Sequence, residues 1–137
     1  MTTPLIAPSL ASLSTAILDR LRSSTGRPIG DLGAPPQAVS PYGFLSRTDT
    51  RWTGSLRNPH EMVVVTYQVQ CVALDTAGVE FLEHRVRQAL AVPPQAEGWR
   101  VLRFAPPDGP SGIRLDRDVT PHLAFSTPQF VITAQPA

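Results

Sequence analysis

The chain has 137 residues, which fits a single domain over 1–137. Its net charge of +1 comes from 12 basic residues, all of them Arg, and 11 acidic residues. This balance argues against a protein that coats nucleic acid, because phosphate binding needs concentrated positive charge. The lone Cys71 excludes an intramolecular disulfide, and the sequence shows neither a signal peptide nor an apolar run that could cross a membrane.

The first predicted element is an amphipathic helix. Ser9 is the predicted N-cap and Gly26 the predicted end. Between them, apolar residues recur at steps of three and four: Leu10, Leu13, Ile17 and Leu21. A Gly/Pro-rich connection over Gly26–Pro36 follows, and then a first strand over about Ala38–Arg47.

The next segment, Thr48–Pro59, is polar and follows neither the helical nor the strand period. We therefore predict a long loop here. Structureless loops of this length inside compact domains usually have a function.

The strongest strand is predicted over about Glu61–Ala73. It places Val65, Tyr67 and Val69 on one face, and we expect that face to be buried under the helices. A second helix follows over about Thr76–Ala91.

Asp75 is the candidate N-cap of this second helix. We place its charged residues, Glu83, Arg85 and Arg87, on the helix surface, away from the apolar stripe.

Three more strands are predicted near the C-terminus, over Trp99–Ala105, Ile113–Val119 and His122–Ala134. Pro128 in the last of them requires an edge position or a bulge. The apolar residues favour a change of inward face at that proline, because Leu123 and Phe125 have one parity and Phe130 and Ile132 the other. These elements predict an α+β fold with two layers: a mixed, mostly antiparallel sheet of about five strands packed with two helices.

Few residues could carry chemistry. Cys71 lies on the apolar phase of the strongest strand, which is typical of a core cysteine. The three histidines, His60, His84 and His122, have no metal-ligand spacing. The glycines of Gly26–Gly33 follow a helix rather than a strand and lack the Lys of a phosphate-binding loop. We therefore predict no catalytic residue, no cofactor and no metal, and no enzyme activity.

Several segments occur in an order that resembles a known family. They are Tyr42–Leu45, Asn58–Pro59, Val65–Val69, Glu83–Leu90 and Gly98–Val101. Together they resemble the tail terminator proteins of long-tailed, siphovirus-type bacteriophages that infect high-GC bacteria. The resemblance covers about Pro41 to Val101.

The resemblance implies a structural protein of the virion, assembled in the host cytoplasm and located at the head-proximal end of the tail. Six copies would form a hexameric ring that caps the tail tube, stops tube polymerisation and offers the docking surface for head–tail joining. The implied partners are further copies of the chain, the tail tube protein and the neck or connector protein of the head. Genome DNA would pass through the lumen without specific binding.

A ring of this kind needs heterologous contacts between its subunits. The best candidates lie in and beside the loop Thr48–Pro59, because Trp and Arg are enriched at interfaces: Arg47, Arg51, Trp52 and Arg57. The alternative is that Trp52 covers the core of its own chain. The second candidate contact is the turn Pro106–Gly112, which contains Asp108, and the alternative there is an ordinary exposed turn.

Other functions stay open. The first alternative is another head–tail connector, neck or tail-completion protein, which shares the class but binds a different partner. A small enzyme or ligand-binding domain is a second, although the sequence offers no convergent acid and base groups for it. A nucleic-acid binder is a third, and it lacks a basic patch and stacking aromatics.

Overall fold

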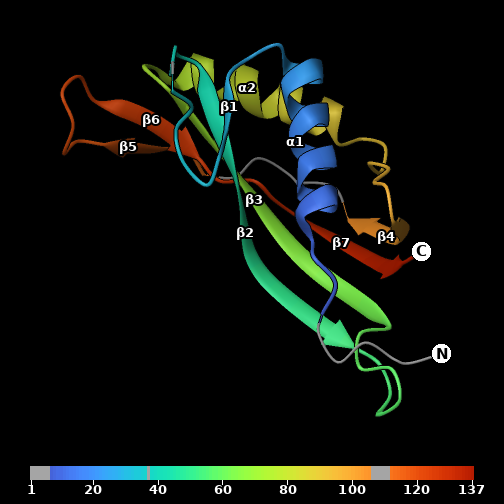
Figure 1. Ribbon diagram of the computed structural model, residues 1–137. Coiled ribbons are helices and arrows are strands. Elements are labelled where there is room, and N and C mark those ends of the chain that lie inside the picture. Colours follow the sequence, from blue (N-terminus) through green and yellow to red (C-terminus); the bar gives the residue numbers. More distant parts are fainter. Residues whose placement is uncertain (1–6, 37, 106–111) are drawn as a thin grey trace.

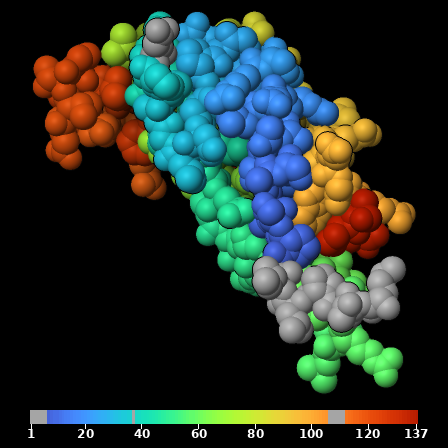
Figure 2. Space-filling view, in the orientation of Figure 1, coloured from blue at the N-terminus to red at the C-terminus, as the bar shows by residue number. Residues whose placement is uncertain are grey.

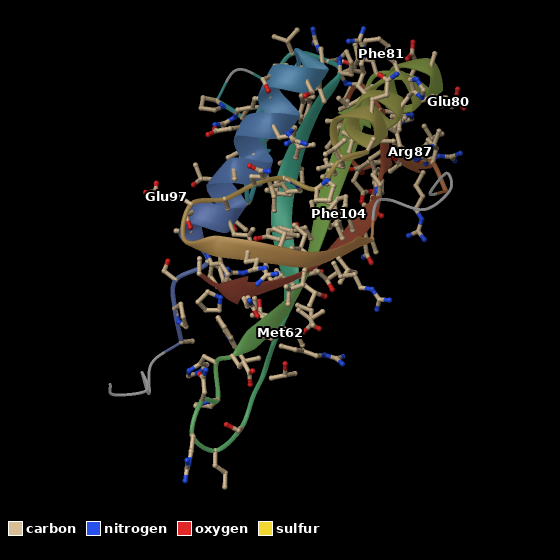
Figure 3. The ribbon with its side chains drawn as sticks, turned by 90° about the vertical axis from the view of Figure 1, so that its right-hand side faces the viewer. Met62, Glu80, Phe81, Arg87, Glu97 and Phe104 are labelled. Carbon is tan, nitrogen blue, oxygen red and sulfur yellow. The ribbon has the colours of Figure 1, made fainter. Side chains whose placement is uncertain are left out.

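The computed structural model describes residues 7–36, 38–105 and 112–137 (Figure 1). Over these residues the chain forms two helices and one mixed sheet of seven strands. In chain order they are α1 (Ala11–Thr25), β1 (Ile29–Asp31), β2 (Tyr42–Thr53), β3 (Met62–Ala73), α2 (Thr76–Ala89), β4 (Trp99–Ala105), β5 (Arg114–Asp116), β6 (Leu123–Ser126) and β7 (Gln129–Pro136). Both helices lie on the same face of the sheet, which we call the covered face (Figures 1 and 3). The α+β fold class predicted from the sequence is confirmed.

The sheet forks around its central strand, β3. On one side β3 pairs with β2, and on the other it pairs with β7 through Val63–Gln68 and with β6 through Cys71–Ala73. β4 extends β7, and β5 extends β6. All of these pairs are antiparallel, and within the described residues only β1 pairs in parallel, with β2.

The fork accounts for part of the difference between seven strands and the five expected. Pro128 separates β6 from β7, and it lies between the residues that pair with β5 and those that pair with β4. The predicted edge position of Pro128 is thus confirmed. The short β1 is the other additional strand. It lies in the Gly/Pro-rich connection, where a Cβ on Gly30 would meet the carbonyl oxygen of Gly33 at 1.9 Å.

The predicted change of inward face at Pro128 is wrong. Ala124 in β6 and Ile132 in β7 are both buried, so the same parity faces the core on both sides of the proline. The physical reason is the register: Ser126 pairs with Cys71 and Gln129 with Gln68, which is one continuous alignment with β3. Leu123 and Phe125 therefore lie on the face opposite to the helices, which we call the open face.

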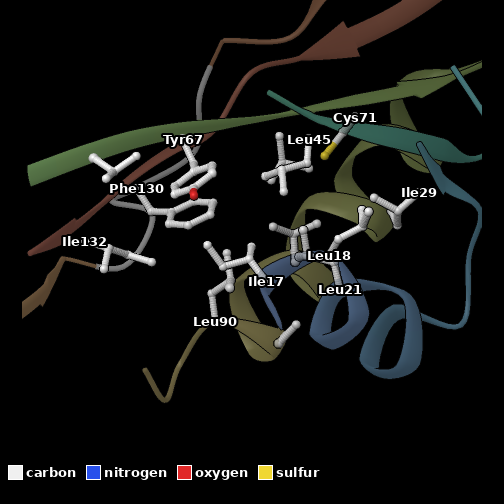
Figure 4. Close-up of a cluster of buried hydrophobic side chains, with 14 of the residues drawn as sticks. Ile17, Leu18, Leu21, Ile29, Leu45, Tyr67, Cys71, Leu90, Phe130 and Ile132 are labelled. Atoms are coloured by element: carbon white, nitrogen blue, oxygen red, sulfur yellow. The ribbon is translucent and has the colours of Figure 1, made fainter. Parts of the chain in front are cut away.

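The core lies between the covered face and the helices. Val65, Tyr67 and Val69 are almost completely buried, as predicted. The rings of Tyr67 and Phe130 stack with their centroids 5.4 Å apart (Figure 4). The two helices contribute their apolar stripes to the same cluster: Leu13, Ile17 and Leu21 from α1 and Val79, Leu82 and Val86 from α2.

The helix ends follow the predicted capping chemistry with small shifts. The N-cap of α1 is Leu10 rather than Ser9, although the Ser9 hydroxyl still accepts a hydrogen bond from the Ala11 N–H at 3.2 Å. Gly26 ends α1 in the left-handed conformation, as predicted. Asp75 caps α2 by accepting a hydrogen bond from the Gly78 N–H at 2.7 Å. Neither helix of the described residues is long and apolar enough to span a membrane.

The surface position predicted for Glu83 is wrong. Its side chain is buried, accepts a hydrogen bond from the Ser126 hydroxyl at 2.7 Å and forms an ion pair with Arg87. Glu83 is next to Leu82 on the helix, at the border of the apolar stripe, and it reaches β6 where the sheet forks. A buried carboxylate of this kind is stable only because both neighbours satisfy it.

The predicted loop Thr48–Pro59 is wrong in its first half, Thr48–Thr53, which belongs to β2, while Gly54–Pro59 does lie in the connection between the two strands. The strand predicted over Ala38–Arg47 is β2, which begins at Tyr42 and continues as far as Thr53. Every residue of Asp49–Thr53 pairs with a residue of β3, so only Gly54–Glu61 connects the two strands. This half of β2 shows no apolar period because the helices do not cover it, and most of its side chains are exposed.

Candidate functional site

A long hairpin of β2 and β3 projects beyond the helices (Figures 1 and 2). Its tip is a closed turn, in which the Ser55 N–H donates to the Asn58 carbonyl and the Asn58 N–H donates to the Ser55 carbonyl, both at 3.1 Å. Gly54 is required just before it, because a Cβ there would lie 2.0 Å from the Asn58 carbonyl oxygen. These contacts give the tip a defined shape.

The turn presents its two central residues, Leu56 and Arg57, to solvent. Leu56 is completely exposed, and Arg57 is exposed beside it. Of these two residues, Arg belongs to the types that are enriched at protein interfaces. Arg57 was predicted from the sequence, whereas Leu56 was missed. Its only sequence signal is an apolar residue within a polar segment.

Trp52, one of the predicted contact residues, packs against its own chain. It is half-buried and packs against the core, with its ring 5.1 Å from His60 in an edge-to-face contact and 6.2 Å from Trp99. It pairs with Val63 and therefore projects to the covered face. The alternative interpretation, in which Trp52 covers the core of its own chain, describes this geometry.

Arg47 and Arg51 lie on β2 but point to opposite faces. Arg51 pairs with Val64 on the open face and forms an exposed ion pair with Asp49 at 3.2 Å. Arg47 pairs with Tyr67 on the covered face, where it lines an open groove together with Asp31.

The Tyr67 hydroxyl borders the same groove and shares a 2.8 Å hydrogen bond with Ser14. Burial raises the pKa of Tyr67, and the Ser14 hydrogen bond and the charge of Arg47 partly offset this. Arg47 therefore lies at the groove and not at the hairpin tip.

The structure thus separates the residues that the sequence placed on one loop. Arg57 is at the tip, Arg51 on the open face, Arg47 at the groove and Trp52 against the core. Asp108 lies outside the described residues.

The reactive and metal-binding side-chain types, Cys and His, form no cluster in the part of the chain that the structure describes. Burial, followed by the negative charge of Glu83, raises the pKa of Cys71 from its ordinary value of 9.0 to about 12, so the thiol stays protonated at neutral pH. The three histidines lie on three different segments: on the hairpin, on α2 and just before β6. No three His, Cys, Asp or Glu side chains come close enough to hold a metal ion among the residues that the structure describes.

The sheet has two free strand edges that were not predicted from the sequence, one on β2 and one on β4. β2 pairs with β1 only through Gly43–Leu45, so from Ser46 to Thr53 its outer edge has no strand partner within the described residues. β4 pairs with β7 alone, and its other edge is free in the same sense. Free edges expose backbone donors and acceptors and are ready sites for pairing with another chain.

Comparison with known proteins gives structural matches alone. No family model matches the sequence, and no curated protein matches it in sequence. The chain is similar in structure to a chain of the virion of the native gene transfer agent particle, with a TM-score of 0.67 and 13% identity over 91% of this chain and 96% of that one. It is also similar to the gp17 protein of bacteriophage SPP1, with a TM-score of 0.50 and 17% identity over 91% of both chains. The fold is therefore one that occurs in phage and phage-like particles.

Proposed function

We propose that the protein is a structural virion protein of a long-tailed phage: a tail terminator that forms a ring on the tail tube. The observation that carries this proposal is the match to a chain of the gene transfer agent virion, because it extends over nearly the whole length of both chains. The match to the phage protein gp17 supports the same class. The family resemblance of segments such as Tyr42–Leu45 and Val65–Val69 supplies the specific role.

A terminator solves a physical problem of polymerisation. A tube grows because each added ring exposes the same adhesive surface again, so its growth has no intrinsic end. A cap binds that surface and presents a different one, to which the head can join. The proposed partners are accordingly other copies of the chain, the tube protein on one side and the neck protein on the other, with genome DNA passing through the lumen.

The surfaces of the molecule suit such an assembly. A ring is built from heterologous contacts, in which one surface of a subunit meets a different surface of its neighbour. The hairpin tip, the free edge of β2 and the free edge of β4 are three distinct surfaces on different parts of the fold (Figures 1 and 2). We therefore assign contacts to the hairpin and to the edges rather than to a loop around Trp52.

A second candidate is another neck or tail-completion protein. The comparison is compatible with it, because the gene transfer agent match is to a chain of the whole virion and does not specify where in the particle that chain lies. Such a protein would share the fold and the virion location but would bind on the head side of the junction.

Deletion of the gene in the parent particle separates these functions. A terminator's absence should leave heads unjoined and allow tubes longer than normal, as measured by negative-stain microscopy of lysates. A neck protein's absence should leave tails of normal length that lack heads. The wild-type gene supplied in trans must restore the particles. Tails of normal length on filled heads in the deletion would contradict both candidates.

A further inference from the structure

The lower half of the sheet in Figure 1 is a four-stranded ribbon with two free edges. Its strands lie in the order β2, β3, β7, β4, and every neighbouring pair in it is antiparallel. Figure 1 shows β2 on one side of this ribbon and β4 on the other, and Figure 3 views it from the β4 side. Within the described residues no strand covers β2 beyond Leu45 or the outer edge of β4.

The two free edges match in direction and length. Because the strands alternate in direction across the four-stranded ribbon, β4 runs opposite to β2. A second copy placed beside the first in the same orientation therefore brings its β4 against β2 as an antiparallel neighbour, which is the more stable kind of ladder. The free part of β2 extends from Ser46 to Thr53, and β4 has 7 residues, so most of each edge can be paired.

The charges along the two edges are complementary. Asp49 and Arg51 project to the open face of β2, where the Asp49 carboxylate is about half-exposed. Arg100 and Arg103 pair with Gln135 and Thr133, so they project to the open face of β4. Pairing of the edges brings a guanidinium of one copy towards Asp49 of the next, and opposite charges across strands stabilise a sheet.

Each edge also carries a device against indiscriminate pairing. The register of β2 shifts between Arg47 and Asp49, and that of β4 shifts between Val101 and Arg103. Bulges and charged side chains of this kind keep free edges from joining unrelated strands. They leave pairing to a partner with a matching bulge and charge pattern.

We propose that β2 of one copy pairs with β4 of a second copy, head to tail, so that the sheet continues from subunit to subunit. This inference rests on the proposed function, because a ring requires one heterologous contact repeated in a closed cycle. The helices then lie on one side of the continuous sheet in every copy. Since the helix layer adds bulk to that side, a closed ring places the helices outside and the open face, with Thr66, Gln68 and Thr133, towards the channel.

Disulfide trapping in assembled particles tests the pairing. Asp49→Cys is combined with Arg103→Cys, and in a second variant with Arg100→Cys, because the bulges leave two registers to be compared. In one copy, positions 49 and 103 are separated by two strands, about 14 Å, which is too far for a disulfide. The native thiol of Cys71 is buried and does not compete. Oxidation should therefore produce a ladder of covalent oligomers that ends at the closed ring.

The controls are matched to the fold. Each single cysteine variant should yield no species larger than a dimer. Asp49→Cys combined with Arg114→Cys, on the edge strand of the other arm of the fork, should yield no ladder. Particles with heads and normal tails that give no ladder with Arg100→Cys or Arg103→Cys would overturn the edge pairing and leave the terminator function in place. The terminator function is tested separately, by the deletion experiment described above.

Discussion

The two faces of β3 differ in what they contribute to the molecule. On the covered face, Val63, Val65 and Tyr67 are at most 1% exposed and support both helices. On the open face, Val64, Thr66 and Gln68 are only half-buried, and no element of the described residues covers them. The same strand thus provides stability through one face and leaves the other for contacts outside the chain. The comparison separates what holds the fold together from what the fold presents.

The largest expected effect is the difference in stability between one substitution on the covered face and the same substitution on the open face. Val65→Asp buries an unpaired carboxylate under the helices, which costs several kcal/mol. Because the whole stability of a domain is about 5–15 kcal/mol, we expect this variant not to fold. The matched change is Val64→Asp, where the new carboxylate lies on the open face beside Arg51. It should remain folded by circular dichroism and thermal unfolding. A cooperatively folded Val65→Asp variant would contradict the assignment of the covered face.

The covered face should also determine stability at alkaline pH. The pKa of Cys71 is raised from 9.0 to about 12 in the folded chain, chiefly by burial and then by the charge of Glu83. The unfolded chain therefore loses this proton first, so the contribution is complete below pH 9 and is lost as the pH rises from about 9 to about 12. Its upper limit is roughly 4 kcal/mol, since one pKa unit corresponds to about 1.4 kcal/mol.

The measurement is denaturant unfolding between pH 7 and 11. Cys71→Ala should lose less stability over this range than the wild type, although some loss should remain because burial also raises the pKa of Tyr67. The variant removes the ionisable group without adding a charge, so the slope against pH is the readout rather than the absolute stability. Equal slopes of stability against pH for both proteins would show that burial does not raise the pKa of Cys71.

The sequence predicted the covered face well because burial imposes a period. Tyr67 and Val69 alternate with polar residues, and the stripes of both helices recur at helical steps, so the layers and the core could be derived. Asp75 and Gly26 could be predicted for a similar reason, since caps depend on local chemistry.

The open parts of the molecule could not be predicted in this way. The outer half of β2 is a strand because its backbone pairs with β3, and this pairing leaves no trace in side-chain periodicity when most of the side chains are exposed. Glu83 was missed because its burial depends on the hydroxyl of Ser126, which is 43 residues away in the chain. The inward face beyond Pro128 was missed because register is a property of two strands and not of one.

The hairpin offers the finest version of the comparison, because it carries both kinds of residue within a few positions. Trp52 packs against His60 and Trp99, so Trp52→Ala should cost about 2 kcal/mol of stability through lost burial. Arg51 and Arg57 are exposed, and replacing both by Ala should change stability by less than about 0.5 kcal/mol.

Assembly should show the reverse order of effects if the hairpin and the β2 edge are contacts of the ring. The double variant Arg51→Ala, Arg57→Ala should be as stable as the wild type in denaturant and yet should fail to restore normal tails to the deletion particle. Trp52→Ala should restore them at temperatures where it stays folded, because Trp52 supports the chain from within. The matched control is Arg85→Ala on α2, an exposed arginine that contacts Phe81 and lies outside the hairpin. Normal tails and joined heads with the double variant would show that Arg51 and Arg57 are not contacts of the ring. The control Arg85→Ala must itself give normal tails and joined heads.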